Sequence, residues 1–162
     1  MLLVDICESF IVIASFVLGW LYQLNNKYII GLNDVLSDRL KYIAQTMSTY
    51  NIKLWGQYIE EHGNGGSIIA KDNYFFIDNS FVRCMYEYGA IVFVLVIVLI
   101  FMAQKKMLDN EKYIMCLAFF IVTIASFAEH HLLEIAYNPF IFSVFACMSN
   151  NDKVIMEEKR IC

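Results

Sequence analysis

The sequence predicts an all-α integral membrane protein with about four transmembrane helices and one large extracytoplasmic loop that contains an amphipathic helix. Three observations predict this fold class. Apolar residues make up 59% of the chain and charged residues only 17%, against about 45–50% and about 25% in soluble domains. Four windows of 16 to 18 residues carry no charged side chain. In the second window, residues 91–102 are apolar on every side, whereas a soluble helical bundle, the alternative fold, would turn a polar face to water.

Length, net charge and cysteine spacing narrow the class of protein further. A chain of 162 residues has the length of a single domain. The net charge of −4 provides no basic surface, which excludes nucleic acid as a partner. The five cysteines are widely spaced and form no CxxC pair, so the sequence predicts neither a disulfide framework nor a metal cluster.

The predicted spans are close in length to the thickness of a membrane. A helix of 16 to 18 residues is roughly 24–27 Å long, against a hydrocarbon core of about 30 Å. Asp5 and Glu8 precede the first span, where a signal peptide would be basic, so we expect this helix to be retained. The four spans cover residues 9–24, 88–104, 113–128 and 135–149.

Residues 25–87 form the large loop between the first two spans, and part of this loop has helical periodicity. Asn33 is a suitable N-cap for the helix, and a helix of this kind can lie on the membrane surface. Its apolar residues follow steps of four, three and four: Leu36, Leu40, Ile43 and Met47.

The distribution of Lys and Arg predicts the orientation of the spans. The short 104–112 turn carries three lysines and the tail carries three basic residues, whereas the break at 129–134 carries none. Short basic segments stay in the cytoplasm. The N-terminus is therefore expected inside, and the 25–87 loop outside the cytoplasmic membrane.

The end of the loop contains the first candidate binding residues. Asp78 or Asn79 is expected to cap a helix that runs straight into the second span. The same helix end can also bind an anion such as phosphate, with Arg83 adding donors one turn later. Arg39, on the amphipathic helix, is open to the same two interpretations: a solvated arginine or a ligand of a diphosphate.

A polar break between the last two spans contains two histidines and two glutamates. His130 and Glu134 are four residues apart and would share a helix face. The pattern is not HExxH and no third distant ligand is evident. Polar caps of the adjoining spans are the favoured interpretation, and no metal site is expected.

Four segments, taken in order, resemble the C-terminal part of bacterial O-antigen and capsular polysaccharide polymerases (Wzy-type). Glu129 and the later YNPF segment at 137–140 are also similar to that family. Each motif is short, so the resemblance lies in the ordered set, which covers residues 30–145. The four segments are LNDVLSDRL at 32–40, YNIKLWGQ at 50–57, IDNSFV at 77–82 and EYGAIVF at 87–93.

The resemblance implies a multi-pass glycosyltransferase of the bacterial cytoplasmic membrane. Such enzymes move a growing glycan from undecaprenyl diphosphate onto a sugar hydroxyl of the next lipid-linked repeat unit, on the outer face. By this analogy Arg39 binds the departing diphosphate and Arg83 is a second candidate. Asp78 and Asn79 are candidates for handling the acceptor, and His62 is a remote option. The resemblance implies no cofactor and no metal.

Two departures from the family pattern bear on these expectations. Asp38 stands where the family commonly has Gly, so its carboxylate is expected to pair with Arg39 and weaken the binding of phosphate. The chain also has far fewer spans than these polymerases. It therefore resembles a C-terminal portion of such an enzyme. The partners that the resemblance implies are membrane lipid, the lipid-linked glycan, and other assembly proteins or a missing N-terminal half.

Two other functions fit parts of the sequence. A non-enzymatic membrane subunit of a polysaccharide export or assembly system explains the hydropathy equally well, although it does not explain the ordered motifs. A small zinc-dependent membrane hydrolase would use His130, His131 and Glu134. Restoration of polymer by the chain, alone or with an N-terminal half, would favour the polymerase over the non-enzymatic subunit. Absence of stoichiometric zinc in the purified protein would exclude the hydrolase.

Overall fold

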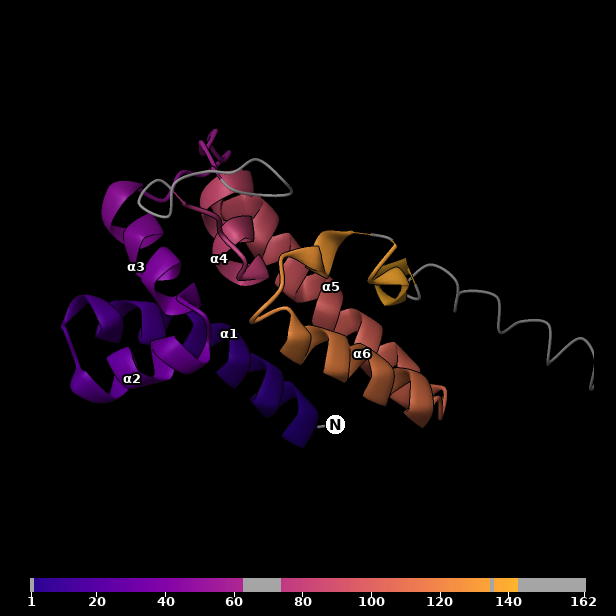
Figure 1. The fold of residues 1–162 in the computed structure, drawn as a ribbon. Helices are drawn as coiled ribbons and strands as arrows, with labels where there is room; N and C mark the ends of the chain where they lie inside the picture. Colours follow the sequence, from indigo (N-terminus) through magenta and orange to yellow (C-terminus); the bar gives the residue numbers. More distant parts are fainter. Residues whose placement is uncertain (1, 63–73, 135, 143–162) are drawn as a thin grey trace, which may run out of the picture.

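The computed structural model describes residues 2–62, 74–134 and 136–142, and this part of the chain is mostly helical, without a β-strand (Figure 1). The described helices are α1 (Leu2–Gln23), α2 (Lys27–Val35), α3 (Arg39–Thr49), α4 (Ser80–Arg83), α5 (Ala90–Asp109) and α6 (Tyr113–Ala125). A π-helical turn, η2 (Cys84–Tyr88), follows α4, and two 3-10 turns, η3 (His131–Leu133) and η4 (Pro139–Phe142), follow α6.

Among the described residues, one helix is long and apolar enough to cross a membrane. This helix is α5, with 20 residues. The Cys7–Gln23 part of α1 and the whole of α2 meet the same test only together, and a bend of 119° separates them. Helix α6 has 13 residues, which is roughly 20 Å of helix. The structure thus has one or two candidate spans, and the predicted four are not confirmed, since most of 135–149 lies outside the described residues.

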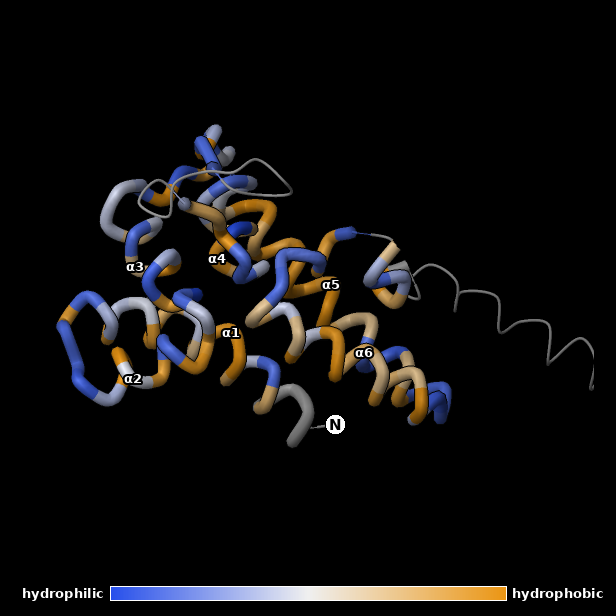
Figure 2. Tube along the Cα trace, viewed as in Figure 1, coloured by the Kyte–Doolittle hydropathy of each residue, from blue (hydrophilic) through white to orange (hydrophobic). Residues whose placement is uncertain are grey.

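Helices α1, α5 and α6 pack side by side, and their apolar residues form one core (Figure 2). Within it Ile100 and Met107 of α5 and Phe119 of α6 are almost fully buried. A polar contact joins α1 to α5, because Gln104 Nε2 donates a hydrogen bond to Glu8 Oε1 and both side chains are buried. The beginning of α1 therefore lies beside the end of α5.

The predicted amphipathic helix is in fact two helices, because the chain turns between them. Ser37 and Asp38 have positive φ values of 53° and 66°, which a continuing α-helix cannot contain. Asn33 lies within α2 instead of capping the predicted helix from outside. It still reaches the next helix, since its Oδ1 accepts a hydrogen bond from the backbone N of Lys41 in α3.

The apolar face of α3 is covered by the protein. Leu40 and Ile43 are 0% and 2% exposed. A Cβ built on Gly19 of α1 would lie 2.4 Å from Ile43 Cγ2, so only glycine allows the two helices to approach so closely. Helix α3 therefore packs on α1. The sequence predicted that its apolar face could lie on a membrane surface, but in the structure this face is buried inside the protein.

The helix after Asn79 does not run straight into the second span. It passes through η2 and ends at Gly89, whose φ of +97° favours glycine. The backbone of Gly89 lies against Gly56, and a Cβ on Gly89 would be 2.3 Å from the Gly56 nitrogen. Helix α5 then begins with Ala90 N donating to Lys53 O. Close backbone packing thus replaces the predicted continuous helix.

Candidate functional site

The structure brings together charged residues from three distant parts of the chain. Arg39 begins α3, Asp78 precedes α4, and Glu129 follows α6. Arg39 Nε lies 3.6 Å from Asp78 Oδ2, and Arg39 NH2 donates a hydrogen bond of 3.2 Å to Glu129 Oε1. About a third of the Arg39 side chain, 31%, is exposed. We call these three residues the Arg39 cluster.

Asp78 is the most buried carboxylate of the Arg39 cluster. Burial raises the pKa of Asp78, because the charged form loses contact with water. Arg39 lowers this pKa and Glu129 raises it, and the net shift is upward. A carboxylate with a raised pKa is a better proton acceptor than an exposed one, which suits Asp78 to general-base chemistry.

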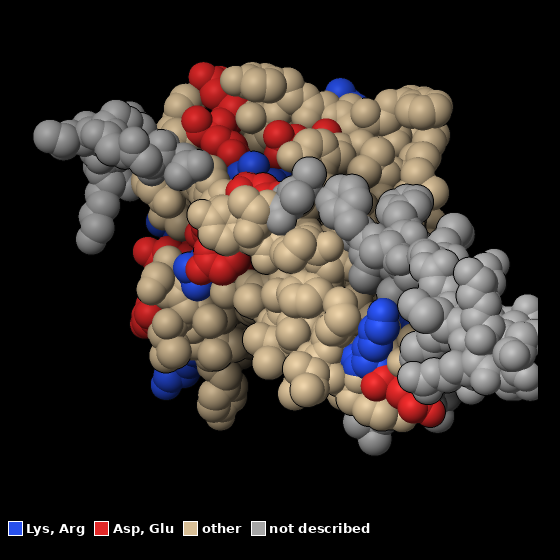
Figure 3. All heavy atoms as spheres, turned by 90° about the vertical axis from the view of Figure 1, so that its right-hand side faces the viewer, with Lys and Arg blue, Asp and Glu red and all other residues tan. Residues whose placement is uncertain are grey.

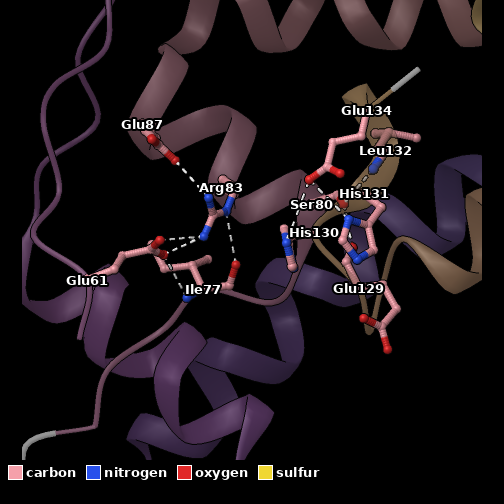
Figure 4. Close-up of polar contacts among 10 residues, drawn as sticks. All are labelled: Glu61, Ile77, Ser80, Arg83, Glu87, Glu129, His130, His131, Leu132 and Glu134. Atoms are coloured by element: carbon pink, nitrogen blue, oxygen red, sulfur yellow. Dashed lines mark hydrogen bonds and ion pairs between the residues drawn. The ribbon is translucent and has the colours of Figure 1, made fainter. Parts of the chain in front are cut away.

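Arg83, the second predicted ligand, occupies a more enclosed and more fully paired environment (Figure 4). Its NH2 lies 2.6 Å from both carboxylate oxygens of Glu61, and its Nε donates to Ile77 O at 3.1 Å. NH1 lies 3.5 Å from Glu87 Oε2, and the guanidinium carbon stacks 4.8 Å from the centroid of Phe76. Only 14% of the Arg83 side chain is exposed. We call Arg83, Glu61 and Glu87 the Arg83 cluster.

The two clusters together hold four carboxylates around two guanidinium groups. A space-filling view shows acidic side chains surrounding basic ones on the upper part of one face (Figure 3). A site of this composition does not by itself present a surplus of positive charge to a diphosphate. Any anion that binds here must displace or neutralise carboxylates.

Of the two predicted cap residues, Asp78 and Asn79, it is Asn79 that caps α4. Its Oδ1 accepts hydrogen bonds from the backbone N of Phe81 and Val82. Its Nδ2 donates to Ser15 Oγ of α1 and to Phe127 O after α6. The side chain is 1% exposed, so its polar atoms are used to join three parts of the fold.

Two other residues lie apart from the Arg39 cluster. The described contacts of His62 are an isolated bridge with Phe75 and an approach of 3.7 Å to Glu60 Oε1, and none reaches Arg39 or Arg83. The sequence predicted an ion pair between Asp38 and Arg39, but the structure does not contain this pair among its described contacts. The Oδ1 of Asp38 accepts a hydrogen bond from Asn33 Nδ2, because the left-handed conformation at Asp38 directs it toward α2.

The 129–134 segment folds back onto α4. Ser80 Oγ donates to Glu129 O, and Leu132 N donates to Ser80 Oγ. The pKa of His130 is lowered, chiefly by burial and then by His131 and Arg83. His130 is therefore held in its neutral form more strongly than an exposed histidine.

A pocket of about 120 Å³ lies between this segment, α4 and η2. Its walls are both apolar and polar. The sequence did not indicate this pocket, because its lining is assembled from segments some 40 residues apart. Its lining residues are Ser80, Arg83, Tyr88, His130, Leu132, Leu133 and Glu134.

Several of the residues in contact with the candidate site were not identified as site residues from the sequence. Glu61 lies 22 positions before Arg83 in a segment without periodicity, and Phe76 lies between Arg83 and His130. Comparison of the chain with family models, curated proteins and solved structures finds no match.

Proposed function

We propose that this chain is the C-terminal portion of an O-antigen or capsular polysaccharide polymerase. In this reaction a glycan moves from undecaprenyl diphosphate onto a sugar hydroxyl of the next lipid-linked repeat unit. The observation that carries the proposal is the convergence of Arg39, Asp78 and Glu129, each from a different segment of the resemblance, in one cluster.

A second pair of motif segments also meets. The LWGQ segment and the EYGAIVF segment pack through Gly56 and Gly89, whose backbones leave no room for a Cβ. Gln57 N donates to Glu87 O, and Gln57 Nε2 donates to Tyr86 O. The residue types of these two motifs therefore have a structural role: the two glycines allow the backbones to come close, and the glutamine holds the two segments together through hydrogen bonds.

The exposed surface of α5 supports insertion into a membrane. Val94, Leu95 and Met102 are 57%, 57% and 52% exposed. A core helix of a soluble protein would cover such side chains, whereas lipid accepts them. Of the Arg39 cluster, Asp78 precedes the short helices that lead into α5 and Glu129 follows the end of α6, whereas the basic residues at 105, 106 and 112 lie at the turn that joins these two helices. The positive-inside rule therefore favours an extracytoplasmic location for the Arg39 cluster.

In the proposed reaction the acceptor oxygen bonds to the anomeric carbon of the donor sugar as the bond from that carbon to the diphosphate oxygen breaks. The electron pair leaves with the diphosphate, whose growing charge Arg39 stabilises. Asp78 takes the hydroxyl proton, since its pKa is raised and its partner Arg39 turns to the phosphate. The pocket of about 120 Å³ that His130 helps to line would bind a hydroxyl-bearing edge of a sugar ring and orient it.

The test uses cells that lack their own polymerase and receive this chain, alone or with an N-terminal half. Arg39→Ala is expected to abolish long glycan chains on a gel while the amount of membrane-inserted protein is unchanged. Lys41→Ala is the matched control, because Lys41 is an exposed cation on the same helix outside the Arg39 cluster. Unchanged chain length in Arg39→Ala would contradict the site. Failure of the wild-type chain to restore any polymer would favour a non-enzymatic subunit.

A further inference from the structure

The turn after α6 brings three potential metal ligands together. The ligand atoms of Glu129, His130 and His131 all lie within 4.8 Å of one another. Two imidazoles and a carboxylate are a donor set typical of zinc. Bonds of about 2.0–2.1 Å place tetrahedral ligand atoms roughly 3.3 Å apart, and Glu129, which is 47% exposed, has room to close this gap. We propose that Glu129, His130 and His131 bind a zinc ion.

A buried imidazole nitrogen without a partner supports a ligand here. The Nδ1 atoms of both histidines are buried: that of His130 has no partner among the described residues, and that of His131 faces a carboxylate oxygen of Glu134 at 3.0 Å. A buried nitrogen without a partner is costly, because burial removes the water that would otherwise bind it. Glu134 Oε1 lies 3.0 Å from His131 Nδ1 and 3.7 Å from His130 Nε2, so a second carboxylate is close enough to join the ion.

Both imidazole rings are held in place by aromatic neighbours. The ring of His130 meets Phe76 edge-on, with centroids 5.0 Å apart, and the ring of His131 stacks on Tyr137 at 4.0 Å. Ser80 fixes the backbone of the turn through its hydrogen bonds with Glu129 and Leu132. A metal site benefits from ligands that are oriented before the ion arrives.

Arg39 provides an outer-shell contact. It donates to Glu129 Oε1, and a carboxylate held in this way can bind a metal through its other oxygen. A divalent cation would also offset the excess of carboxylates in the two clusters. If the proposed function holds, which this last step assumes, the ion would add positive charge beside Arg39 for a diphosphate.

The experiment titrates zinc chloride into the purified full chain in detergent, after treatment with a chelator, and follows the heat of binding. One zinc ion per chain is expected. Cobalt in place of zinc should give the visible absorption of a tetrahedral site. Loss of an outer-shell partner alone costs about 10–100-fold in affinity, so His130→Ala with His131→Ala should cost more than about 100-fold.

His62→Ala is the matched control, because His62 is the only other histidine of the chain, and it should leave zinc affinity unchanged. If the double variant does not fold, His130→Gln and His131→Gln are measured singly, with thermal unfolding as the check on folding. Equal zinc affinity in the wild type and the folded variants, or loss of binding in His62→Ala, would overturn the proposal. Zinc binding is measured without glycan, so its failure is distinct from failure of polymer formation.

Discussion

Arg39 and Arg83 are the same residue type with the same predicted ligand, yet their environments differ. Arg83 is 14% exposed and is bound by Glu61, Glu87, a backbone carbonyl and an aromatic ring. Arg39 is 31% exposed, and its carboxylate contacts, at 3.2 and 3.6 Å, are longer than the 2.6 Å contact of Arg83 with Glu61 and similar to its 3.5 Å contact with Glu87.

The difference teaches how to separate a structural cation from a functional one. The donors of Arg83 are satisfied within the fold, so a ligand would have to break close contacts that the protein already makes. Arg39 makes looser contacts at the surface, and exchanging them for phosphate oxygens costs less. The comparison assigns stability to the Arg83 cluster and ligand binding to the Arg39 cluster.

The largest expected effect is on stability, from Arg83→Ala. Removing Arg83 leaves Glu61, whose side chain is 19% exposed, without the guanidinium that contacts both of its oxygens, and it also removes the longer contact with Glu87, which is 30% exposed. Breaking a buried ion pair from one side costs about 3–5 kcal/mol, and the partial exposure of Glu61 reduces the expected cost here to about 1–3 kcal/mol. Thermal unfolding of the purified chain should show a large fall in the unfolding temperature. A fall no greater than that in Arg39→Ala would break the distinction between the two clusters.

Arg39→Ala should change stability much less. Partly exposed ion pairs contribute about 0–1 kcal/mol, because water and salt screen them. The unfolding temperature should therefore stay close to the wild-type value although polymer formation is lost. Raised salt should reduce the small difference further. A loss of stability comparable to that of Arg83→Ala would show that Arg39 is also a structural residue.

Local features of the fold could be predicted from sequence. A cap at Asp78 or Asn79 was predicted, and Asn79 provides it, because an N-cap depends on the two or three residues that follow it. The apolar character of α5 was equally plain, since it depends on composition alone. Arg39 and Asp78 were singled out separately, and the structure brings them together.

Features that depend on distant contacts were missed. The helix break before α5 arises because the backbone of Gly89 packs against that of Gly56, and the sequence around either glycine does not indicate this contact. The predicted Asp38–Arg39 pair was wrong for a similar reason: adjacency along the chain does not set the direction of a side chain where φ is positive. The partner of Arg83, Glu61, lies in a segment without periodicity.

The smallest expected effect comes from Glu87→Gln, and it depends on pH. Burial raises the pKa of Glu87 above its ordinary value of 4.5, more than Arg83 lowers it. Folding therefore disfavours the charged form at neutral pH, and the folded chain gains stability relative to the unfolded chain as pH falls through the raised pKa. Glutamine resembles the neutral form at every pH. Glu87→Gln should unfold at a slightly higher temperature than the wild type at neutral pH, and this advantage should shrink toward pH 4.5.

The control for this measurement is Glu60→Gln, because Glu60 lies outside both clusters and is 69% exposed. Other titrating groups are common to all three proteins, so their contributions cancel when unfolding temperatures are subtracted at each pH. The difference for Glu60→Gln should change little with pH. A Glu87→Gln variant that is less stable than the wild type at neutral pH would mean that the Arg83 contact outweighs burial. In that case Glu87 would stabilise Arg83 as a charged partner, and the Arg83 cluster would be held by two favourable ion pairs instead of one.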